Sequence, residues 1–424
     1  MRTSWWMLVG LLLAGCGPAV GQTLTPATTE IASKAAPEAT LAPPATSTSG
    51  PAAIQEPAAT ATPEIAQSAP APGGVPDVDT SKHSVPLEQV YFDTFRPVNR
   101  AVPLSRASAD LILQLRDAIP PIHNPRYEAA GDAVWLNDED AVIGYAVGDQ
   151  AWAYPIRILN FHEIVNDNLA GEEVLISYCP LCYSGIVYSR ELGDRTLTFG
   201  NTSALYESDM VMLDYETGSY WWQVAGEAIV GDLTGERLTV LPSRTTTWGR
   251  WKELYPQTLV LSRDTGFPRN YDRDPFSGYA EIVNSGRFAF PVSEAGQDPR
   301  LAPATEVLAV KVGDEARAYP LAALGYAASA DTVGGLEIVV FTDPEVPAGV
   351  AFEPVARGQS LTLVVQDGRF VDQETGSTWD LAGRAIAGPL QGEQLPPVPA
   401  RTSYWFAIIA AEPDITVYQP STAG

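Results

Sequence analysis

The sequence is poor in the residues that most often carry chemistry, with only three cysteines and three histidines among 424 residues. Basic residues are also scarce, since 26 lysines and arginines face 51 aspartates and glutamates, which gives a net charge of −25. A chain this acidic is a poor partner for nucleic acid. No Ser-His-Asp order, phosphate-binding glycine loop or nucleotide fingerprint is evident, so no nucleotide cofactor is expected. The sequence therefore indicates no particular reaction, and only a few side chains are candidates for a chemical role.

The N-terminus carries one short apolar run, from Trp5 to Leu13, after a single positive charge at Arg2. The run is too short for a permanent transmembrane helix, and it predicts a signal peptide over residues 1–15. It ends in Leu-Ala-Gly-Cys16, which resembles the bacterial lipobox. That resemblance implies a lipid on Cys16 and an extracytoplasmic lipoprotein, anchored on the outer face of the cytoplasmic membrane or in the outer membrane.

The segment after the anchor is rich in Ala, Pro, Thr and Ser and has no aromatic residue. Such a composition cannot bury enough apolar surface to offset the entropy of ordering. Residues 16–85 are therefore predicted to be a lipid anchor and a disordered tether. Every Tyr and Phe lies in residues 86–424, which predicts that the folded region begins there.

The folded region contains an internal repeat. The segment Val147–Pro155 recurs as Val312–Pro320, and Asp214–Trp221 recurs as Asp372–Trp379. Residues 225–238 also match residues 382–395 at nine of fourteen positions. The predicted organisation is an N-terminal extension with one helix (86–140), repeat 1 (141–262), a connector (263–305) and a degenerate repeat 2 (306–420).

Apolar residues in both repeats alternate with a period of two between Gly-Asp and Thr-Gly turns, which is typical of β-hairpins. The predicted fold class is α+β, dominated by antiparallel hairpins with a few short helices. In repeat 1 we expect hairpins over 141–155, 185–200, 211–223 and 227–241 and a buried strand over 174–178. Helices are expected over 108–119, 158–167 and 246–254.

Two of the three cysteines form the motif Cys179-Pro-Leu-Cys182, directly after the predicted strand. In an oxidising compartment they are expected either to close a structural or redox-active disulfide or to bind a soft metal such as copper or zinc. A thioredoxin-type site needs a helix N-terminus at the first cysteine, whereas residues 183–189 are predicted as strand or turn. A zinc ribbon needs a second pair of cysteines, and none exists.

His162 and Glu163 lie one predicted strand before the cysteines. They do not form the HExxH motif, because the position four residues after His162 is Asn166. Aligning the two repeats places Ala327 and Ala328 opposite this pair and Asp343 opposite Cys179. Because these chemical residues are confined to repeat 1 while the turn residues persist in both copies, they are predicted to form a functional site.

The segment Arg157-Ile-Leu-Asn-Phe-His-Glu-Ile-Val-Asn-Asp167, followed by the Tyr178–Cys182 motif, resembles the bacterial and archaeal family called domain of unknown function 3179. Phe199-Gly200 and Met212–Ser219 extend the resemblance, which covers residues 116–291. It implies supporting roles at the site for Arg157, Asn160, Asn166 and Asp167 and no established activity. His123 stands where this family suggests an acidic residue, which counts against it as a ligand.

Three hypotheses follow. The leading one is a copper or zinc site formed by His162, Cys179 and Cys182, with Glu163, Met210 or Met212 as the fourth ligand, for metal binding or metal-dependent redox chemistry. The second is a thiol-disulfide redox protein that uses Cys179 and Cys182. The third is a non-enzymatic binding module with a ligand near the tryptophans, although core packing is the favoured explanation for these, namely Trp221, Trp222, Trp248 and Trp251. Apart from membrane lipid at Cys16, no partner is indicated.

Overall fold

The computed structural model describes residues 74–96, 98, 100–345 and 348–420. The predicted signal peptide, Cys16 and most of the tether lie outside the described residues. The end of the tether differs from the prediction, because residues 82–84 lie against strand β14 (Glu227–Val230) and His83 forms a bridge with Val230. The Ser84 amide donates to the Ile229 carbonyl over 3.0 Å, and Lys82 forms an ion pair with Asp232. The folded region therefore begins before Pro86.

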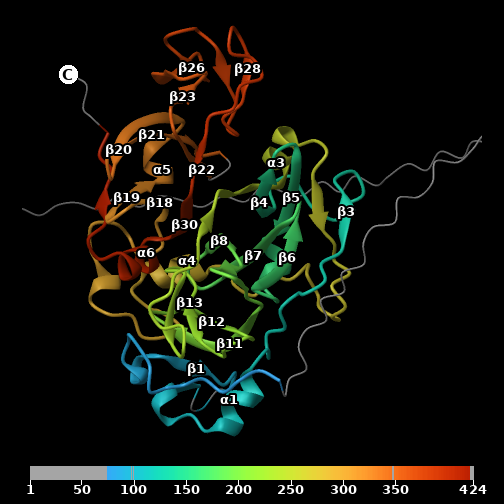
Figure 1. The fold of residues 1–424 in the computed structure, drawn as a ribbon, viewed down its shortest axis with the longest axis vertical. Helices are drawn as coiled ribbons and strands as arrows, with labels where there is room; N and C mark the ends of the chain where they lie inside the picture. The colour runs from blue at the N-terminus through green and yellow to red at the C-terminus, as the bar shows by residue number, and fades with distance from the viewer. Residues whose placement is uncertain (1–73, 97, 99, 346–347, 421–424) are drawn as a thin grey trace, which may run out of the picture. The chain divides into compact units, whose positions relative to one another are not determined.

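The fold is α+β and dominated by antiparallel strands, as predicted, and the same series of elements occurs twice (Figure 1). Repeat 1 contains β4 (Ala141–Val147), β5 (Gln150–Pro155), α2 (Ile156–Leu159), β6 (Ile164–Leu169), β7 (Glu172–Cys179), β8 (Ser184–Ser189), β9 (Glu191–Leu192), β10 (Arg195–Thr196), β11 (Phe199–Tyr206), β12 (Asp209–Asp214), β13 (Tyr220–Trp222), β14, β15 (Val240–Leu241), β16 (Ser243–Thr247), α3 (Trp248–Leu254) and β17 (Leu259–Leu261).

Repeat 2 has the corresponding elements in the same order: β18 (Glu306–Val312), β19 (Glu315–Pro320), α5 (Leu321–Leu324), β20 (Ala327–Val333), β21 (Leu336–Asp343), β22 (Ala348–Phe352), β23 (Val355–Ala356), β24 (Gln359–Ser360), β25 (Leu363–Gln366), β26 (Arg369–Asp372), β27 (Thr378–Trp379), β28 (Ala385–Ala387), β29 (Pro397–Val398), β30 (Ala400–Tyr404), α6 (Trp405–Ala411) and β31 (Thr416–Val417). The strand pairings also correspond, since β16 pairs with β4 as β30 pairs with β18.

The two repeats join through one sheet of order β31-β19-β18-β30-β8-β7-β6, in which β30 of repeat 2 lies beside β8 of repeat 1. Equivalent arginines are exchanged between them. Arg244 of repeat 1 donates to the Leu381 carbonyl over 3.2 Å, and Arg401 of repeat 2 donates to the Val224 carbonyl over 2.9 Å. The repeats are thus related by a pseudo-two-fold arrangement in which each holds the other.

The N-terminal extension packs on repeat 1, and the connector packs on both repeats. The N-terminal extension contains η1 (Leu87–Gln89), β1 (Tyr91–Asp93), β2 (Ala101–Pro103), η2 (Leu104–Arg106), α1 (Ala109–Leu115) and β3 (Tyr127–Ala129), and the connector contains α4 (Tyr279–Asn284) and η3 (Ala295–Gln297). Strand β1 pairs with β11, so the extension enlarges the sheet of order β14-β13-β12-β11-β1-β2. Within the described residues, no helix is both long and apolar enough to cross a membrane.

Four predicted elements differ from the structure. The helix expected over 158–167 is limited to α2, because the left-handed backbone of Glu163 (φ 59°) ends the turn and Ile164-Val165 begin β6. The hairpin expected over 185–200 is limited to β9 and β10 around Gly193-Asp194, because β8 pairs with β7 and β15. Over 227–241 the turn at Thr234-Gly235 forms, but β14 pairs with β13 and β15 pairs with β8. The helix expected over 108–119 is shortened to α1, and Asp117 is left-handed (φ 54°).

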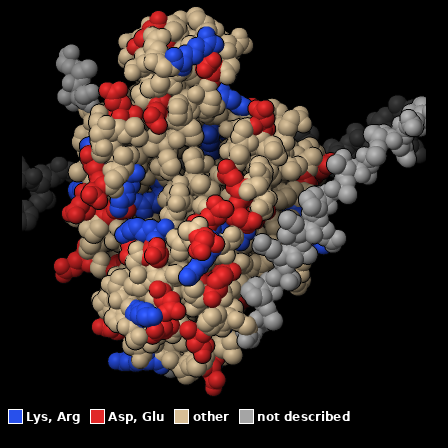
Figure 2. All heavy atoms as spheres, in the orientation of Figure 1, with Lys and Arg blue, Asp and Glu red and all other residues tan. Residues whose placement is uncertain are grey.

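The tryptophans proposed for a binding face are part of the core. Trp221, Trp248 and Trp251 are at most 1% exposed, and Trp222 is 7% exposed. Core packing is therefore their role, as the sequence favoured. On the face drawn in Figure 2, acidic side chains are spread among fewer basic ones without a continuous basic patch, in keeping with the net charge.

Candidate functional site

The two cysteines lie on a buried turn between two central strands. Cys179 ends β7 and pairs with Ser184 at the start of β8, so the motif forms the tip of a hairpin. Both side chains are buried, with 1% and 0% exposure, and both are free thiols. Tyr183 completes the turn with a left-handed backbone (φ 51°). Because the turn joins strands, neither thiol lies at a helix N-terminus, as the sequence predicted.

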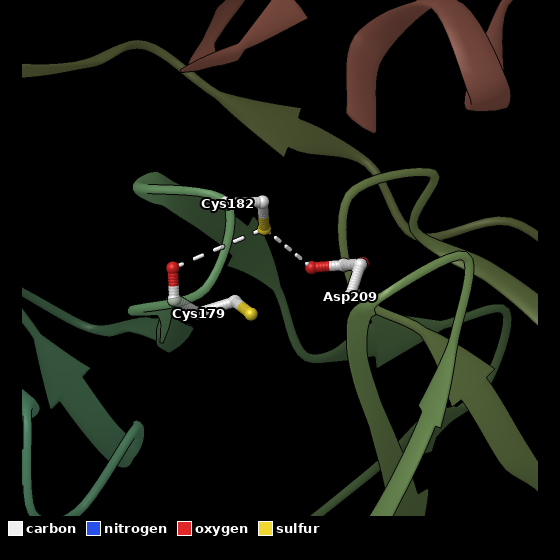
Figure 3. A group of neighbouring side chains, drawn as sticks. All are labelled: Cys179, Cys182 and Asp209. Carbon is white, nitrogen blue, oxygen red and sulfur yellow. Dashed lines mark hydrogen bonds between the residues drawn. The ribbon is translucent and has the colours of Figure 1, made fainter. Parts of the chain in front are cut away.

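A third ligand atom reaches the cysteines from another hairpin. Asp209 begins β12 after a tight turn at Glu207 and Ser208, whose φ values are 53° and 57°. The Cys182 thiol donates to Asp209 Oδ1 over 2.8 Å, and the Val224 amide donates to Oδ2 over 2.8 Å. The two sulfurs and a carboxylate oxygen lie within 4.8 Å of one another (Figure 3), so this buried group can hold a metal ion.

Polar side chains behind the cysteines fix their orientation. Ser184 Oγ lies 3.1 Å from Cys182 Sγ and donates to Gln223 Oε1 over 2.6 Å. Gln223 Nε2 in turn donates to Ser177 Oγ over 2.9 Å. From repeat 2, Ser403 Oγ donates to the Cys182 carbonyl over 2.9 Å, and the Tyr404 amide donates to the same carbonyl over 2.8 Å. Outer contacts of this kind hold metal ligands in place in many proteins.

The site is acidic and has no positive side chain paired with it. Asp209 forms no ion pair among the described residues. Burial raises the pKa of Asp209 to about 6, although hydrogen bonds from Cys182 and Val224 oppose that shift. Burial also raises the pKa of the Cys179 and Cys182 thiols. Without a bound cation the thiols are therefore protonated and unreactive.

A cavity of about 230 Å³ leads to Cys179. Glu163, Asn201 and Met210 line it, together with apolar side chains such as Leu181. Asn201 Nδ2 donates to Glu163 Oε2 over 2.6 Å and lies 3.5 Å from Met210 Sδ. Burial raises the pKa of Glu163 to about 8. The two side chains expected as fourth ligands, Glu163 and Met210, thus share a cavity with Cys179, whereas Met212 is buried in the core.

The expected Cys-Cys-His ligand set is not the group that the structure brings together. His162 is fully buried, but its Nδ1 lies 2.7 Å from the Pro120 carbonyl and its Nε2 lies 2.6 Å from the Tyr271 hydroxyl. Burial lowers its pKa to about 4, so the ring is neutral and both nitrogens are used. The left-handed backbone at Glu163 separates the two neighbours, which gives each a different set of partners.

The four residues expected to support the site have structural partners. Arg157 pairs with Asp140 over 2.8 Å, and Asn160 donates to Asp274 over 3.3 Å. Asn166 bonds both the amide and the carbonyl of Phe199. Asp167 accepts hydrogen bonds from the hydroxyls of Tyr127 and Tyr154.

The other histidines are also away from the cysteines. His123 Nε2 lies 3.4 Å from the Tyr215 hydroxyl, and burial lowers the pKa of His123 to about 4. His83 Nδ1 lies 2.9 Å from the Val85 carbonyl. Neither belongs to a group that can hold a metal among the described residues.

Asp209 is the member of this group that the sequence did not indicate. The comparison of repeats selected residues present only in repeat 1, but Asp367 occupies the position five residues before Asp372, as Asp209 does before Asp214. The usable signal was the position of Asp209 at the very start of an apolar strand after a two-residue turn. In repeat 2, Asp343 replaces Cys179 and pairs with Arg250 of repeat 1 over 3.0 Å, so an internal ion pair occupies that place.

Backbone strain is concentrated around the site. Among the non-glycine residues with left-handed backbones are Asp117, Glu163, Tyr183, Ser203, Glu207 and Ser208, all in or beside the segments described above. Each such residue costs roughly 1–3 kcal/mol and persists where the surroundings enforce it, often at functional sites.

Comparison with known proteins identifies the family to which the chain belongs. No curated protein and no solved structure matches the chain. A family model described as "Protein of unknown function (DUF3179)" matches residues 116–415. This range extends beyond residues 116–291, where the sequence resemblance was seen, and includes most of repeat 2. The chain therefore belongs to the DUF3179 family, whose domain spans both repeats.

Proposed function

We propose that this protein binds one transition metal ion, zinc or copper(I), through the thiolates of Cys179 and Cys182 and the carboxylate of Asp209. The observation that carries the proposal is the convergence of these three ligand atoms within 4.8 Å in a buried place without a positive side chain. Three buried acidic groups are costly to ionise unless a cation accompanies them. A bound metal provides that cation and releases the thiol protons.

The donor set favours zinc, and the neighbouring cavity offers a route to copper. Zinc is bound by thiolates and carboxylates together, with a fourth position that is open in catalytic sites. Cys179 lines the cavity together with Glu163 and Met210, so these two side chains are the ones that would complete the coordination. Copper(I) prefers sulfur ligands, so in a copper(I) site Met210 Sδ would take the place of the Asp209 oxygen. The metal then serves binding, transfer or redox chemistry.

Metal analysis of the full chain, purified without a metal-binding tag and under anaerobic conditions, tests this proposal. We expect about one metal per chain, lost in Cys179→Ser and in Asp209→Asn. His162→Gln is the matched control, because His162 is buried nearby and uses both nitrogens elsewhere. Retention of the metal in Asp209→Asn together with its loss in His162→Gln would restore the Cys-Cys-His set. Metal-free protein with a Cys179–Cys182 disulfide would refute the proposal.

Thiol-disulfide exchange is the weaker candidate. Redox-active cysteines have a lowered thiol pKa and access to solvent. Here burial raises the pKa of both thiols, and neither is more than 1% exposed. Thiol titration in defined redox buffers distinguishes the two, because a metal protects both thiols while a redox pair cycles between forms.

The location of the protein is a separate part of the proposal. The lipobox-like sequence at Cys16 supports export and lipid attachment, so the metal site would lie outside the cytoplasm. We expect the protein in the detergent-extracted membrane fraction and Cys16→Ser in the soluble or unprocessed fraction. A wild-type chain that is released without detergent would contradict the anchor.

A further inference from the structure

A second cavity, of about 440 Å³, adjoins the cysteine turn at Pro180. Pro180 and Phe276 line both this cavity and the one that leads to Cys179. Its walls come from repeat 1, from the connector and, through Asp140 and Tyr404, from the N-terminal extension and repeat 2. All four parts of the folded region therefore contribute to it.

The cavity contains tyrosine hydroxyls that the protein itself does not use. Tyr178 and Tyr404 line it, and their residues are only 3% and 8% exposed. Among the described residues neither hydroxyl has a hydrogen-bond partner, and the same holds for Tyr183. None of these hydroxyl oxygens is among the buried atoms without a partner, so they are open to the cavity and free to bond a ligand.

The tyrosines form one aromatic surface. Tyr183 stacks on Tyr404 with ring centroids 5.6 Å apart, and its edge-to-face contact with Tyr178 has centroids 6.1 Å apart. Phe276 adds a further ring from the connector. Aromatic surfaces attract cations, and organic ammonium ions in particular.

The lining of the cavity is negatively charged, which suits an organic cation. Its lining includes the carboxylates of Asp140, Asp274 and Glu281 and one positive group, Arg157, which is already paired with Asp140 over 2.8 Å. Glu306 lies across the β18–β30 ladder from Tyr404, and its Oε2 is buried without a partner. Two carboxylates of the lining therefore remain without a cation among the described residues.

We infer that this cavity binds a small organic cation that carries a primary ammonium group. The ammonium donates to Asp274 and Glu281, and its alkyl chain lies on the tyrosine surface. The unpartnered Tyr178 and Tyr404 hydroxyls accept from further donors of the ligand. This inference goes beyond metal binding and does not depend on it, because no metal ligand lines the cavity.

Calorimetric titration of the full chain with 1,4-diaminobutane tests the inference, with 1,4-butanediol as the uncharged probe of similar shape. We expect one diamine per chain, an affinity that falls as salt is added, and no measurable binding of the diol. Asp274→Asn combined with Glu281→Gln should weaken diamine binding at least tenfold, and Tyr404→Phe should weaken it several-fold. Tyr326→Phe is the matched control, since Tyr326 does not line the cavity.

Several results would overturn the inference. They are the absence of diamine binding, equal binding of the diol, or an equal loss in Tyr326→Phe. Metal content measured on the same samples separates this outcome from a failure of the metal proposal. If the protein contains metal but does not bind the diamine, only the cation site is refuted. If the protein is free of metal but binds the diamine, only the metal site is refuted.

Discussion

Glu163 is a carboxyl group buried beside Asp209 without a positive partner among the described residues, and its protonation is therefore linked to folding. Burial raises its pKa from 4.5 to about 8. A carboxyl with a raised folded-state pKa contributes its full stability below the unfolded pKa, near 4.5, and loses it as the pH rises toward 8. We expect the free energy of unfolding of metal-free protein to fall by on the order of 3 kcal/mol between pH 5 and pH 8.

Glu163→Gln should remove most of this fall, because glutamine keeps an acceptor for Asn201 and cannot ionise. The part that remains comes from Asp209, whose pKa is raised in the same direction. Urea unfolding followed by tryptophan fluorescence at pH 5, 6.5 and 8 measures both effects. The exposed Glu236→Gln variant should behave as wild type. An unchanged pH profile in Glu163→Gln would show that Glu163 is already ionised in the folded protein.

Among individual residues, the sequence indicated the two cysteines, but the structure groups them with Asp209 instead of the expected His162. Comparing two copies of one fold identifies residues that only one copy needs, and it selected Cys179, Cys182 and Glu163. It also selected His162, whose task is to bond Pro120 and Tyr271. Neither contact can be read from spacing, because Tyr271 is 109 residues away in the connector.

Strand β4 and helix α3 pack through Gly144 and Trp251. A Cβ atom on Gly144 would lie 2.4 Å from ring atoms of Trp251. In repeat 2 the corresponding pair is Ala309 and Ile408, so a larger strand residue faces a smaller helix residue. We expect Gly144→Ala to destabilise the protein by about 1–3 kcal/mol through overpacking. Thermal unfolding measures the change.

A double-mutant cycle tests the cause. The cost of Gly144→Ala should shrink when it is measured in the Trp251→Ile background, because the clashing ring is gone. An equal cost in both backgrounds would mean that backbone conformation, and not the tryptophan, requires glycine at this position.

The turns after β12 and β26 are built in the same way. Asp214 accepts from the Thr217 amide over 2.6 Å and from Trp221 Nε1 over 2.8 Å, and Asp372 does the same for Thr375 and Trp379. We expect Asp214→Asn and Asp372→Asn each to lower stability by about 1–3 kcal/mol.

Only Asp214→Asn should also lower metal affinity, because β12 begins at the ligand Asp209 and ends at Asp214. Competition with a chelator dye measures the affinity of both variants. Equal losses in the two variants would show that global stability, and not the position of Asp209, controls metal binding.

Elements written as alternating strands around Gly-Asp turns were predictable, such as the β4–β5 hairpin at Gly148-Asp149. The segment from Ile158 to Asp167 was not, because its apolar spacing fits a helix and its strand partner is β7. Tertiary pairing decides such a segment. The same holds for β8, which pairs with β7 on one side and with β30, more than 200 residues later, on the other.

At the scale of the molecule, repeat 2 lacks the site residues but braces them. Strand β30 lies beside β8, and Ser403 and Tyr404 bond the Cys182 carbonyl. We expect a chain that ends at residue 305 to lose cooperative unfolding and to bind no metal. Ser403→Ala should fold and bind metal more weakly, as loss of one outer contact does elsewhere. A chain ending at residue 305 that unfolds cooperatively with one metal bound would contradict this role.

The exchanged arginines, Arg244 and Arg401, have an evolutionary consequence. Two identical subunits make reciprocal contacts of this kind across a two-fold axis. The chain thus has the contact pattern of a two-fold homodimer built from two copies of one repeat. In such an arrangement only one copy has to hold the site, provided that the other supplies the bracing strand. We expect a comparison of family sequences to show fewer substitutions in β30 than in the segment around Asp343.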